Sequence, residues 1–440
     1  MQSHDVLIIS ESGQLHGTVP IAGAKNAVLV TMGSLLLTRG VSKLYNVPAS
    51  DDVFTMIELL CDSGAEINFI QDQGILIVDT TSVYRWVVRP DIMRKMRASI
   101  LVLGPLLARF GRADIALPGG CSLGARPIDL HLKGLVKMGA EYDITGSTLT
   151  ARAKELHGAR IVLDYPSVGA TENILMAAVG ARGITKIINA ALEPEVLDLI
   201  DVLRKMGAQI IIESPASIII TGVDNLQPIE HEILFDRLEV GSLLLAVAVT
   251  GGTIELPHVR ADILDVFLEK LSEMGHQVII GPEQRGISFT AAQYPHAVDI
   301  ITGPYPQFPT DLQAPFMVAQ CRAEGVSEVY ETVYENRMGH VPELIKMGAD
   351  ITVNGDRAQI VGPALLTGTT VVASDIRASC ALAIAGLVAR GSTVMEGIHH
   401  WRRGYMRLEE KLAQLGGSIH VGRLEATGEF SKLFSNLSLS

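Results

Sequence analysis

Two kinds of apolar pattern alternate along the chain and predict two kinds of helix. A recurring signature, such as Leu203-Arg-Lys-Met-Gly207-Ala-Gln-Ile210, predicts an amphipathic helix that stops at a C′ glycine and is followed at once by a strand. Six other segments are apolar on nearly all faces, which is typical of buried helices. They are Ala27–Leu37, Ser99–Ala108, Asn173–Gly180, Gly241–Val249, Leu312–Ala319 and Ala378–Leu387.

The glycine of this signature recurs with a nearly constant period. It stands at positions 64, 139, 207, 275, 348 and 416, with separations of 75, 68, 68, 73 and 68 residues. Each period contains one buried helix, one amphipathic helix and several short strands. The sequence therefore predicts an α/β fold built from six βαβ-type repeats.

Charged or polar residues stand where the buried helices begin. An unpaired buried charge is costly, and helix amino termini attract anions, so these starts predict an anion site. The alternative is that the charges are surface caps and salt bridges, with Asp311 an ordinary N-cap. The starts are Lys25-Asn26, Arg97, Ser167–Glu172, Arg237–Glu239, Thr310-Asp311 and Arg377.

A glycine-rich segment, Leu117–His131, carries both a thiol and a guanidinium. Gly119, Gly120 and Gly124 exclude a regular helix, so we expect a loop that presents Cys121 and Arg126. Such a loop suits a lid over a charged substrate. The alternative is a surface turn whose cysteine is incidental.

Composition narrows the class of protein. The 440 residues carry a formal net charge of −12 and no basic run among aromatics, so we expect no nucleic-acid partner. The best apolar run, Ser242–Thr250, is too short to span a membrane. Four scattered cysteines without metal-ligand spacing suit a reducing compartment. The first residues lack the basic start of a signal peptide, so we expect a cytoplasmic protein.

With these motifs together, the chain resembles the enolpyruvyl transferases over essentially its full length. The motifs are Gly23-Ala-Lys-Asn-Ala27, Met96-Arg-Ala-Ser99, Leu117–His131, Ser167-Val-Gly-Ala-Thr171, Glu193-Pro-Glu195, Phe308-Pro-Thr-Asp311, Glu335-Asn-Arg337, Ile376-Arg-Ala-Ser379 and Arg403-Gly-Tyr405. The resemblance implies a two-domain inverse α/β barrel with three repeats per domain. It implies a discontinuous domain of residues 1–21 and 235–440, an inserted domain of residues 22–234, and substrate binding between them.

The resemblance also implies an activity. It is closest to the branch that transfers enolpyruvate from phosphoenolpyruvate to the 3′-hydroxyl of UDP-N-acetylglucosamine with release of phosphate, the first committed step of peptidoglycan synthesis. One alternative is a transferase that makes 5-enolpyruvylshikimate-3-phosphate, against which the cysteine of the loop argues. Another is a catalytically inactive regulator that binds the nucleotide-sugar.

Site residues follow from the same resemblance. It implies Cys121 as general acid and fosfomycin target, Asp311 as general base, and Lys25 and Arg403 as further catalytic residues. Phosphoenolpyruvate would bind Lys25, Asn26, Arg126, Arg377 and Arg403. UDP-N-acetylglucosamine would bind Asn26, Arg97, Arg126, Pro127, Ile128, Asp129, Leu130, Tyr165, Ser167, Val168, Asp311 and Val333.

Some positions are less certain from the pattern. Tyr165 departs from the family, in which many members have a lysine. His131 either orients the substrate phosphates or is structural. Cys61, Cys321 and Cys380 lie in or next to helical patterns, so we expect them to serve packing. We expect no metal and no cofactor, because arginines can neutralise the phosphates.

Overall fold

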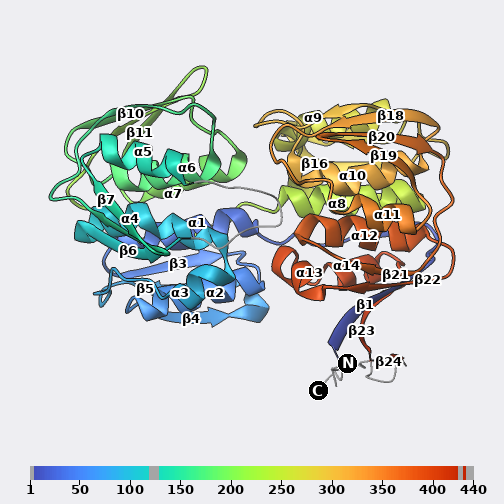
Figure 1. Cartoon of the computed structure of the whole chain (residues 1–440), viewed down its shortest axis with the longest axis horizontal. Coiled ribbons are helices and arrows are strands. Elements are labelled where there is room, and N and C mark those ends of the chain that lie inside the picture. The colour runs from blue at the N-terminus through green and yellow to red at the C-terminus, as the bar shows by residue number, and fades with distance from the viewer. Residues whose placement is uncertain (1–3, 118–127, 425–429, 433–440) are drawn as a thin grey trace. The chain divides into compact units, whose positions relative to one another are not determined.

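The computed structural model describes residues 4–117, 128–424 and 430–432. Over these residues the chain forms two compact units. We call the stretch from Ala22 to Asp236 the inserted unit, and residues up to Ile21 together with those from Arg237 onward the terminal unit. In Figure 1 the inserted unit carries the blue-to-green part of the chain, and the terminal unit carries the yellow-to-red part with the first blue strands.

The third repeat shows the plan of the fold most simply. Its two parallel strands flank a buried helix, and a second helix leads into an antiparallel hairpin, giving the sheet order β11-β12-β10-β9. This is the predicted βαβ-type unit. Its elements are β9 (Arg160–Val162), α6 (Val168–Ala178), β10 (Ile184–Ile188), α7 (Pro194–Lys205), β11 (Gln209–Glu213) and β12 (Ser217–Thr221).

The other two repeats of the inserted unit vary this plan. In the first, the outer parallel strand β13 (Glu230–Glu232) comes from the far end of the unit. The rest of that repeat is α1 (Lys25–Ser34), η1 (Leu35–Leu37), β3 (Val41–Tyr45), α2 (Asp51–Asp62), β4 (Glu66–Ile70), η2 (Gln71–Gln73) and β5 (Ile75–Asp79). The second repeat comprises α3 (Pro90–Lys95), η3 (Arg97–Val102), α4 (Leu103–Phe110), β6 (Arg112–Ala116), α5 (Asp129–Lys137), β7 (Glu141–Thr145) and β8 (Thr148–Arg152).

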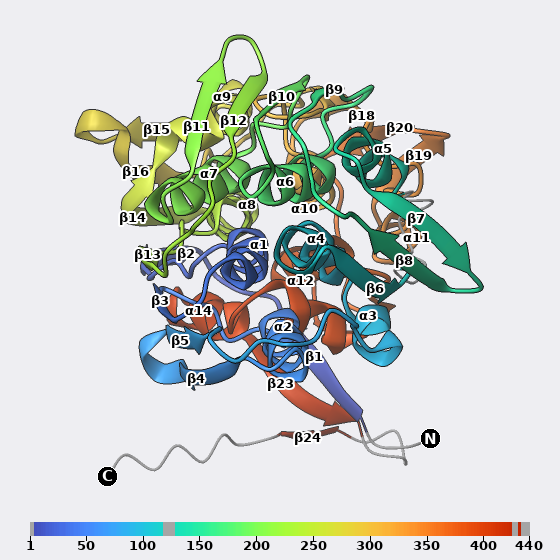
Figure 2. The ribbon, with the colours of Figure 1, turned by 90° about the vertical axis from the view of Figure 1, so that its left-hand side faces the viewer.

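The terminal unit holds the other three repeats, and two amino-terminal strands complete them. β2 (Leu15–Thr18) pairs in parallel with β14, and β1 (His4–Ser10) lies between β22 and β23, beside β23 in Figures 1 and 2. The fourth repeat comprises α8 (Arg237–Thr250), β14 (Gly252–Arg260), η4 (Ala261–Leu264), α9 (Asp265–Glu273), β15 (Gln277–Ile280), η5 (Pro282–Gln284) and β16 (Arg285–Thr290). The fifth comprises β17 (Ile300–Ile301), α10 (Thr310–Arg322), β18 (Gly325–Tyr330), α11 (Val341–Lys346), β19 (Asp350–Asn354) and β20 (Arg357–Gly362). The sixth comprises β21 (Thr370–Val372), α12 (Ile376–Val388), β22 (Ser392–Glu396), α13 (Ile398–Gly404), α14 (Leu408–Gln414), β23 (Ile419–Leu424) and β24 (Phe430–Lys432).

The six signature glycines end their helices as predicted. All six have φ between +93° and +107°, in the left-handed region that side chains rarely adopt. A strand begins two or three residues after each of them. The period found in the sequence is therefore the length of one structural repeat.

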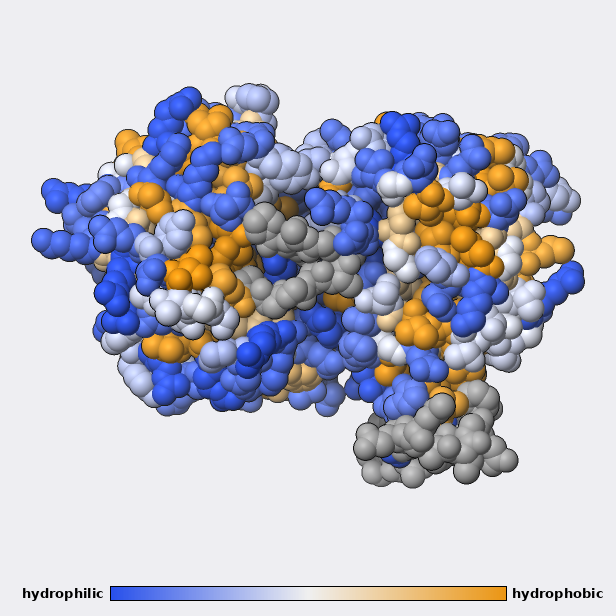
Figure 3. Space-filling view, in the orientation of Figure 1, coloured by the Kyte–Doolittle hydropathy of each residue, from blue (hydrophilic) through white to orange (hydrophobic). Residues whose placement is uncertain are grey.

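The apolar helices are buried as predicted. In the terminal unit α8, α10 and α12 contact one another, and every residue of α8 from Arg237 to Val249 is buried. Some aliphatic residues remain on the outer faces of the sheets, for example Ile211 and Ile279. Figure 3 shows hydrophobic residues among the hydrophilic ones on the visible face of each unit.

One predicted helix is divided. Residues Ser99–Ala108 do not form one α-helix, because a 3₁₀ helix, η3, precedes α4. The N–H of Gly104 donates to the side chain of Asn173 at 2.7 Å rather than to the preceding turn, and Pro105 has no N–H. The local helix therefore restarts at Leu103.

Candidate active site

Asp311 lies at the centre of a charged cluster in the terminal unit. Its two carboxylate oxygens accept from two different arginines, Oδ1 from Arg337 at 2.6 Å and Oδ2 from Arg377 at 2.8 Å. Both arginine side chains are buried, with 2% and 6% exposed, whereas that of Asp311 is 28% exposed. The carboxylate thus keeps a solvent-facing side while two guanidinium groups fix its orientation.

The expectation that Asp311 is an N-cap is wrong. The N-cap of α10 is Pro309, and Asp311 is the second residue of the helix. A carboxylate in the first turn still interacts favourably with the helix dipole. Its fixed partners, however, are the arginines, which come from segments distant in the sequence.

Arg377 is held at both ends of its guanidinium. Nη2 donates to Asp311, and Nη1 donates to the hydroxyl of Tyr405 at 3.0 Å. The carboxylate of Asp375 caps α12 by accepting from the backbone N–H groups of Arg377 and Ala378. Because a short polar cap fixes the start of the helix, it also fixes where the Arg377 side chain begins.

Val333 and Arg403 complete the predicted residues of the terminal unit. The backbone N–H of Val333 donates to Glu331 at 2.8 Å, and Thr310 donates to the same carboxylate. Arg403 lies in the last turn of α13, a favourable place for a cation. Val333 is thereby tied to the first residue of α10, next to Asp311.

Lys25 is the first residue of α1 in the inserted unit and is buried, with 8% of its surface exposed. Its ammonium lies 3.3 Å from the carboxylate of Asp52, which is in the first turn of α2. This ion pair explains how a cation is retained at a buried helix start. Asn26 follows it and is exposed.

Backbone pairing sets the position of Lys25. The chain before it lies against the end of the inserted unit, with Ala24 donating to the carbonyl of Leu234 at 2.6 Å. On its other side the chain packs closely against Asn46, and Gly23 permits this, because a Cβ there would lie 1.9 Å from the carbonyl oxygen of Asn46. The Gly-Ala-Lys-Asn motif therefore has a steric reason as well as a chemical one.

The predicted nucleotide-sugar residues of the inserted unit lie at helix starts. Arg97 begins η3, and Asp129 and Leu130 begin α5 after Ile128. Ser167 caps α6 by accepting from the N–H of Ala170, at 3.4 Å, and Val168 is the first residue of that helix. Tyr165 is 40% exposed just before this cap.

His131 is buried and contacts Asn173, as a structural role would require. It is 4% exposed, and its Nδ1 lies 2.9 Å from the amide nitrogen of Asn173. Since the amide donates, Nδ1 acts as an acceptor. Burial, followed by the charge of Arg97, lowers the pKa of His131 to about 4, so the ring is neutral at physiological pH.

Glu172 does not supply the charge that we predicted at the start of the third buried helix, α6. Glu172 lies inside the helix rather than before it and is 4% exposed. Burial raises its pKa well above 4.5, and the nearby Glu195 and Glu193 raise it further. The surroundings therefore favour the protonated form of this carboxyl group.

Three predicted site residues, Cys121, Arg126 and Pro127, lie outside the described residues. Among the other cysteines, Cys321 and Cys380 are buried in α10 and α12, as packing requires. The expectation for Cys61 is wrong, because it is exposed on α2. Helical spacing alone did not show which face of α2 is covered.

Sequence reasoning missed two partners. Arg337 lies in the Glu335-Asn-Arg337 motif, which could have suggested it, although the motif does not indicate its contact with Asp311. Asp52 carries no signal beyond its place in a first helical turn. In both cases the contact depends on tertiary structure.

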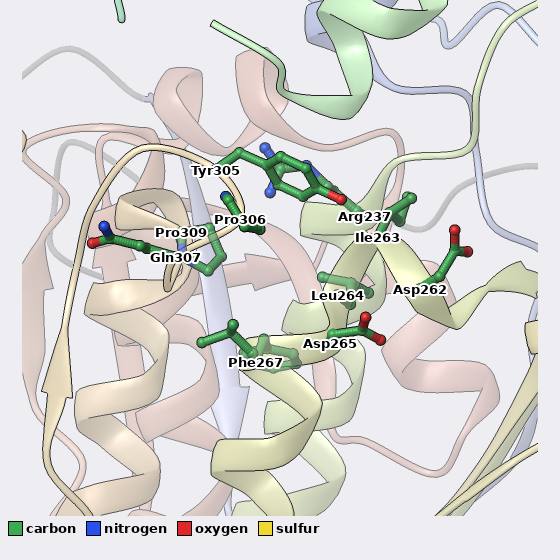
Figure 4. Close-up of a pocket in the computed structure, with 11 residues that line it drawn as sticks. Arg237, Asp262, Ile263, Leu264, Asp265, Phe267, Tyr305, Pro306, Gln307 and Pro309 are labelled. Carbon is green, nitrogen blue, oxygen red and sulfur yellow. The ribbon is translucent and has the colours of Figure 1, made fainter. Parts of the chain in front are cut away.

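A further small cavity lies at three helix starts of the terminal unit (Figure 4). It has a volume of about 50 Å³, and Arg237 and Tyr305 lie on one side of it. Asp265 and Pro309 also line it, but Asp311, Arg377 and Arg403 do not. Burial raises the pKa of Tyr305, which keeps its hydroxyl neutral.

The described part of the chain shows neither a metal-binding cluster nor a membrane-spanning helix. No group of three or more histidine, cysteine, aspartate or glutamate side chains there is arranged to hold a metal ion. Likewise, none of its helices combines the length and apolar character needed to cross a bilayer.

Comparison with known proteins identifies the family. The sequence model of a protein family, described as EPSP synthase (3-phosphoshikimate 1-carboxyvinyltransferase), matches residues 9–412. The UDP-N-acetylglucosamine 1-carboxyvinyltransferase of Dinoroseobacter shibae is 47% identical over 417 residues, covering 94% of this chain and 98% of its own. The chain belongs to the enolpyruvyl transferase family. A second relative of the same name, from Cereibacter sphaeroides, is 46% identical over 94% of this chain and 99% of its own.

Solved enolpyruvyl transferases share the fold. The enolpyruvyl transferase NikO from Streptomyces tendae matches with a TM-score of 0.87 at 24% identity, covering 95% of this chain and 98% of its own. EPSP synthase from Acinetobacter baumannii matches with a TM-score of 0.74 at 18% identity, covering 95% and 100%. These matches confirm the predicted fold class, the inverse α/β barrel of this family.

Proposed function

We propose that the protein transfers the enolpyruvyl group of phosphoenolpyruvate to the 3′-hydroxyl of UDP-N-acetylglucosamine and releases phosphate. The observation that carries this proposal is the 46–47% identity, over 94% of the chain, to relatives named for that transfer. The alternative acceptor, shikimate 3-phosphate, has weaker support, because the matched EPSP synthase structure is only 18% identical.

The reaction needs a base for the acceptor hydroxyl and an acid for the vinyl carbon. As the hydroxyl oxygen bonds to C2 of phosphoenolpyruvate, its proton passes to Asp311, and C3 takes a proton from the thiol of Cys121. The resulting tetrahedral adduct then loses phosphate, which carries away the proton held by Asp311. The thiolate of Cys121 takes back a proton from C3, which restores the double bond and returns both residues to their starting state. Each oxygen of Asp311 accepts from one arginine, and the carboxylate keeps a solvent-facing side from which it can take a proton.

Cations and polar groups would bind the two substrates. We assign phosphoenolpyruvate to Lys25, Asn26, Arg126, Arg377 and Arg403, since arginine grips phosphate and carboxylate in a bidentate manner. The nucleotide-sugar is assigned to two groups of residues, one in each unit. They are Asn26, Arg97, Arg126, Pro127, Ile128, Asp129, Leu130, Tyr165, Ser167 and Val168, and Asp311 and Val333.

We further propose that both groups act on one pair of substrates and belong to two domains, residues 1–21 with 235–440 and residues 22–234. Lys25 would then bind the donor substrate, phosphoenolpyruvate, and Asp311 would act on the hydroxyl of the acceptor, UDP-N-acetylglucosamine, in the same turnover. Lys25→Ala and Asp311→Asn should therefore abolish the same phosphate release. If either variant retained turnover, the residue substituted in it would not be required for the reaction.

This reaction would take place in the cytoplasm as the first committed step of peptidoglycan synthesis. Through the cell wall it would support cell shape, the cell cycle and cell division. Fosfomycin would inhibit it by alkylating Cys121. The proposed partners are the two small-molecule substrates.

The direct test is phosphate release from phosphoenolpyruvate with each acceptor. We expect release with UDP-N-acetylglucosamine and none with shikimate 3-phosphate. Release with the second acceptor alone would instead favour the EPSP synthase reaction. Binding of the nucleotide-sugar without any release would favour the inactive regulator.

A further inference from the structure

Tyr405 follows the predicted phosphoenolpyruvate ligand Arg403 and has no role in the function proposed above. It ends α13 in an extended conformation and is 4% exposed. Gly404 before it allows the end of α13 to approach α12, because a Cβ there would lie 2.3 Å from Cγ2 of Ile376. The glycine thus brings Tyr405 beside the first turn of α12, which carries Arg377.

The Tyr405 hydroxyl joins three helices. It accepts from Nη1 of Arg377 at 3.0 Å, and it lies 3.4 Å from the hydroxyl oxygen of Ser242 on α8, whose own proton goes to the carbonyl of Leu238. Its own proton is then available to the oxygen of Ser242 or to the sulfur of Cys380 on α12, with both of which it interacts. The hydroxyl is therefore held by polar groups inside the protein.

The aromatic ring packs separately from the hydroxyl. The ring centroids of Tyr405 and Trp401 lie 5.4 Å apart, and the guanidinium carbon of Arg377 lies 5.6 Å from the Tyr405 centroid. Phenylalanine could make both ring contacts. The hydroxyl is needed only for the polar network.

Arg377 links this network to the carboxylate of Asp311. One terminal nitrogen of its guanidinium bonds Tyr405 and the other bonds Asp311 Oδ2 at 2.8 Å. An arginine side chain has several rotatable bonds, so a single contact would leave its orientation poorly determined. Two contacts at opposite ends of a planar group fix that orientation.

We propose that Tyr405 is a positioning residue for the transfer reaction, which orients Arg377 through its hydroxyl and, through Arg377, the carboxylate of Asp311. This proposal rests on the function proposed above. Tyr405 acts behind the charged cluster and does not touch the substrate in this role.

The test compares Tyr405→Phe with the wild-type full-length protein. We expect kcat to fall roughly tenfold, as for the loss of one hydrogen bond to a charged group. The acid limb of the kcat profile should move to higher pH, because Asp311 would be held less firmly by Arg377. Asp311 also faces Arg337, and Glu331 and Asp375 lie at neighbouring helix starts, so the profile should be compared at constant ionic strength.

Tyr330→Phe is a matched control. The Tyr330 ring also contacts an arginine, Arg357, at 4.4 Å, but it lies on β18 outside the proposed machinery. We expect its kcat and pH profile to equal those of the wild type. Ser242→Ala gives a second test if Tyr405→Phe does not fold, because it removes a partner of the Tyr405 hydroxyl and leaves Arg377 intact. It should shift the acid limb in the same direction by a smaller amount.

The outcomes separate the two proposals. If the wild type releases no phosphate with either acceptor, the proposed function fails. If the wild type is active and Tyr405→Phe retains its kcat and acid limb, the positioning role fails alone. A lower unfolding temperature with an unchanged acid limb would likewise reduce Tyr405 to a packing residue.

Discussion

Lys25 and Asp52 form an ion pair that is buried on both sides. The ammonium and carboxylate lie 3.3 Å apart, with only 10% and 6% of the two side chains exposed. Removing one member of such a pair leaves an uncompensated buried charge. The pair therefore links the stability of the inserted unit to the retention of Lys25, which we propose as a ligand of phosphoenolpyruvate.

Asp52→Asn should destabilise the protein because it leaves the Lys25 ammonium without its carboxylate. We expect the free energy of unfolding to fall by about 3 kcal/mol, within the range for broken buried pairs. Denaturant unfolding measures this change. The exposed pair Lys186–Glu213, at 2.7 Å, supplies the control, since Glu213→Gln should cost less than about 1 kcal/mol. Equal losses for the two variants would show that burial adds nothing to the Lys25 pair.

Asp311→Asn should keep nucleotide-sugar binding and lose most turnover. The amide cannot accept the proton, and general-base catalysis is worth roughly 10²–10⁴-fold. The substitution also removes the charge between Arg337 and Arg377, so we expect some loss of thermal stability. Phosphate release and isothermal titration with the nucleotide-sugar measure the two effects. Turnover within a few-fold of the wild type would limit Asp311 to a structural role.

Fosfomycin with the nucleotide-sugar should modify Cys121 alone. Burial raises the pKa of Cys321 to about 12 and also raises that of Cys380, so neither thiol supplies thiolate at neutral pH. Cys61 is the competitor because it is exposed, although partial burial raises the pKa of its thiol. Peptide mass spectrometry locates the adduct, and Cys61→Ser is the control. An adduct on Cys61 and none on Cys121 would contradict the assignment.

Glu172 should make the protein less stable as pH rises. Burial raises its folded-state pKa above 4.5, so the folded protein holds this proton more tightly than the unfolded chain does. The free energy of unfolding must then decrease from about pH 4.5 upward until the folded-state pKa is passed, by up to about 1.4 kcal/mol per pH unit. Glu172→Gln should remove this decrease and raise stability at neutral pH. Urea unfolding between pH 5 and 8 measures it, and parallel pH slopes for the two proteins would refute it.

The repeat and its turns could be predicted because they are local. A glycine at each helix end and an apolar helix in each period follow from residues within a few positions of one another, and all six glycines have the required positive φ. The family resemblance gave the candidate residues for the same reason, because its motifs are short. It could not say what holds each side chain.

Tertiary structure decided the partners. Arg377 lies 66 residues after Asp311, and Asp52 lies 27 residues after Lys25, so no helical or strand period relates them. The exposure of Cys61 likewise depends on which elements cover α2. The division between η3 and α4 depends on the side chain of Asn173, which comes from another repeat and accepts from the N–H of Gly104. Periodicity in a sequence reports which face of an element is apolar. Only packing between repeats determines which charge meets which, because the cost of burying an unpaired charge acts through space rather than along the chain.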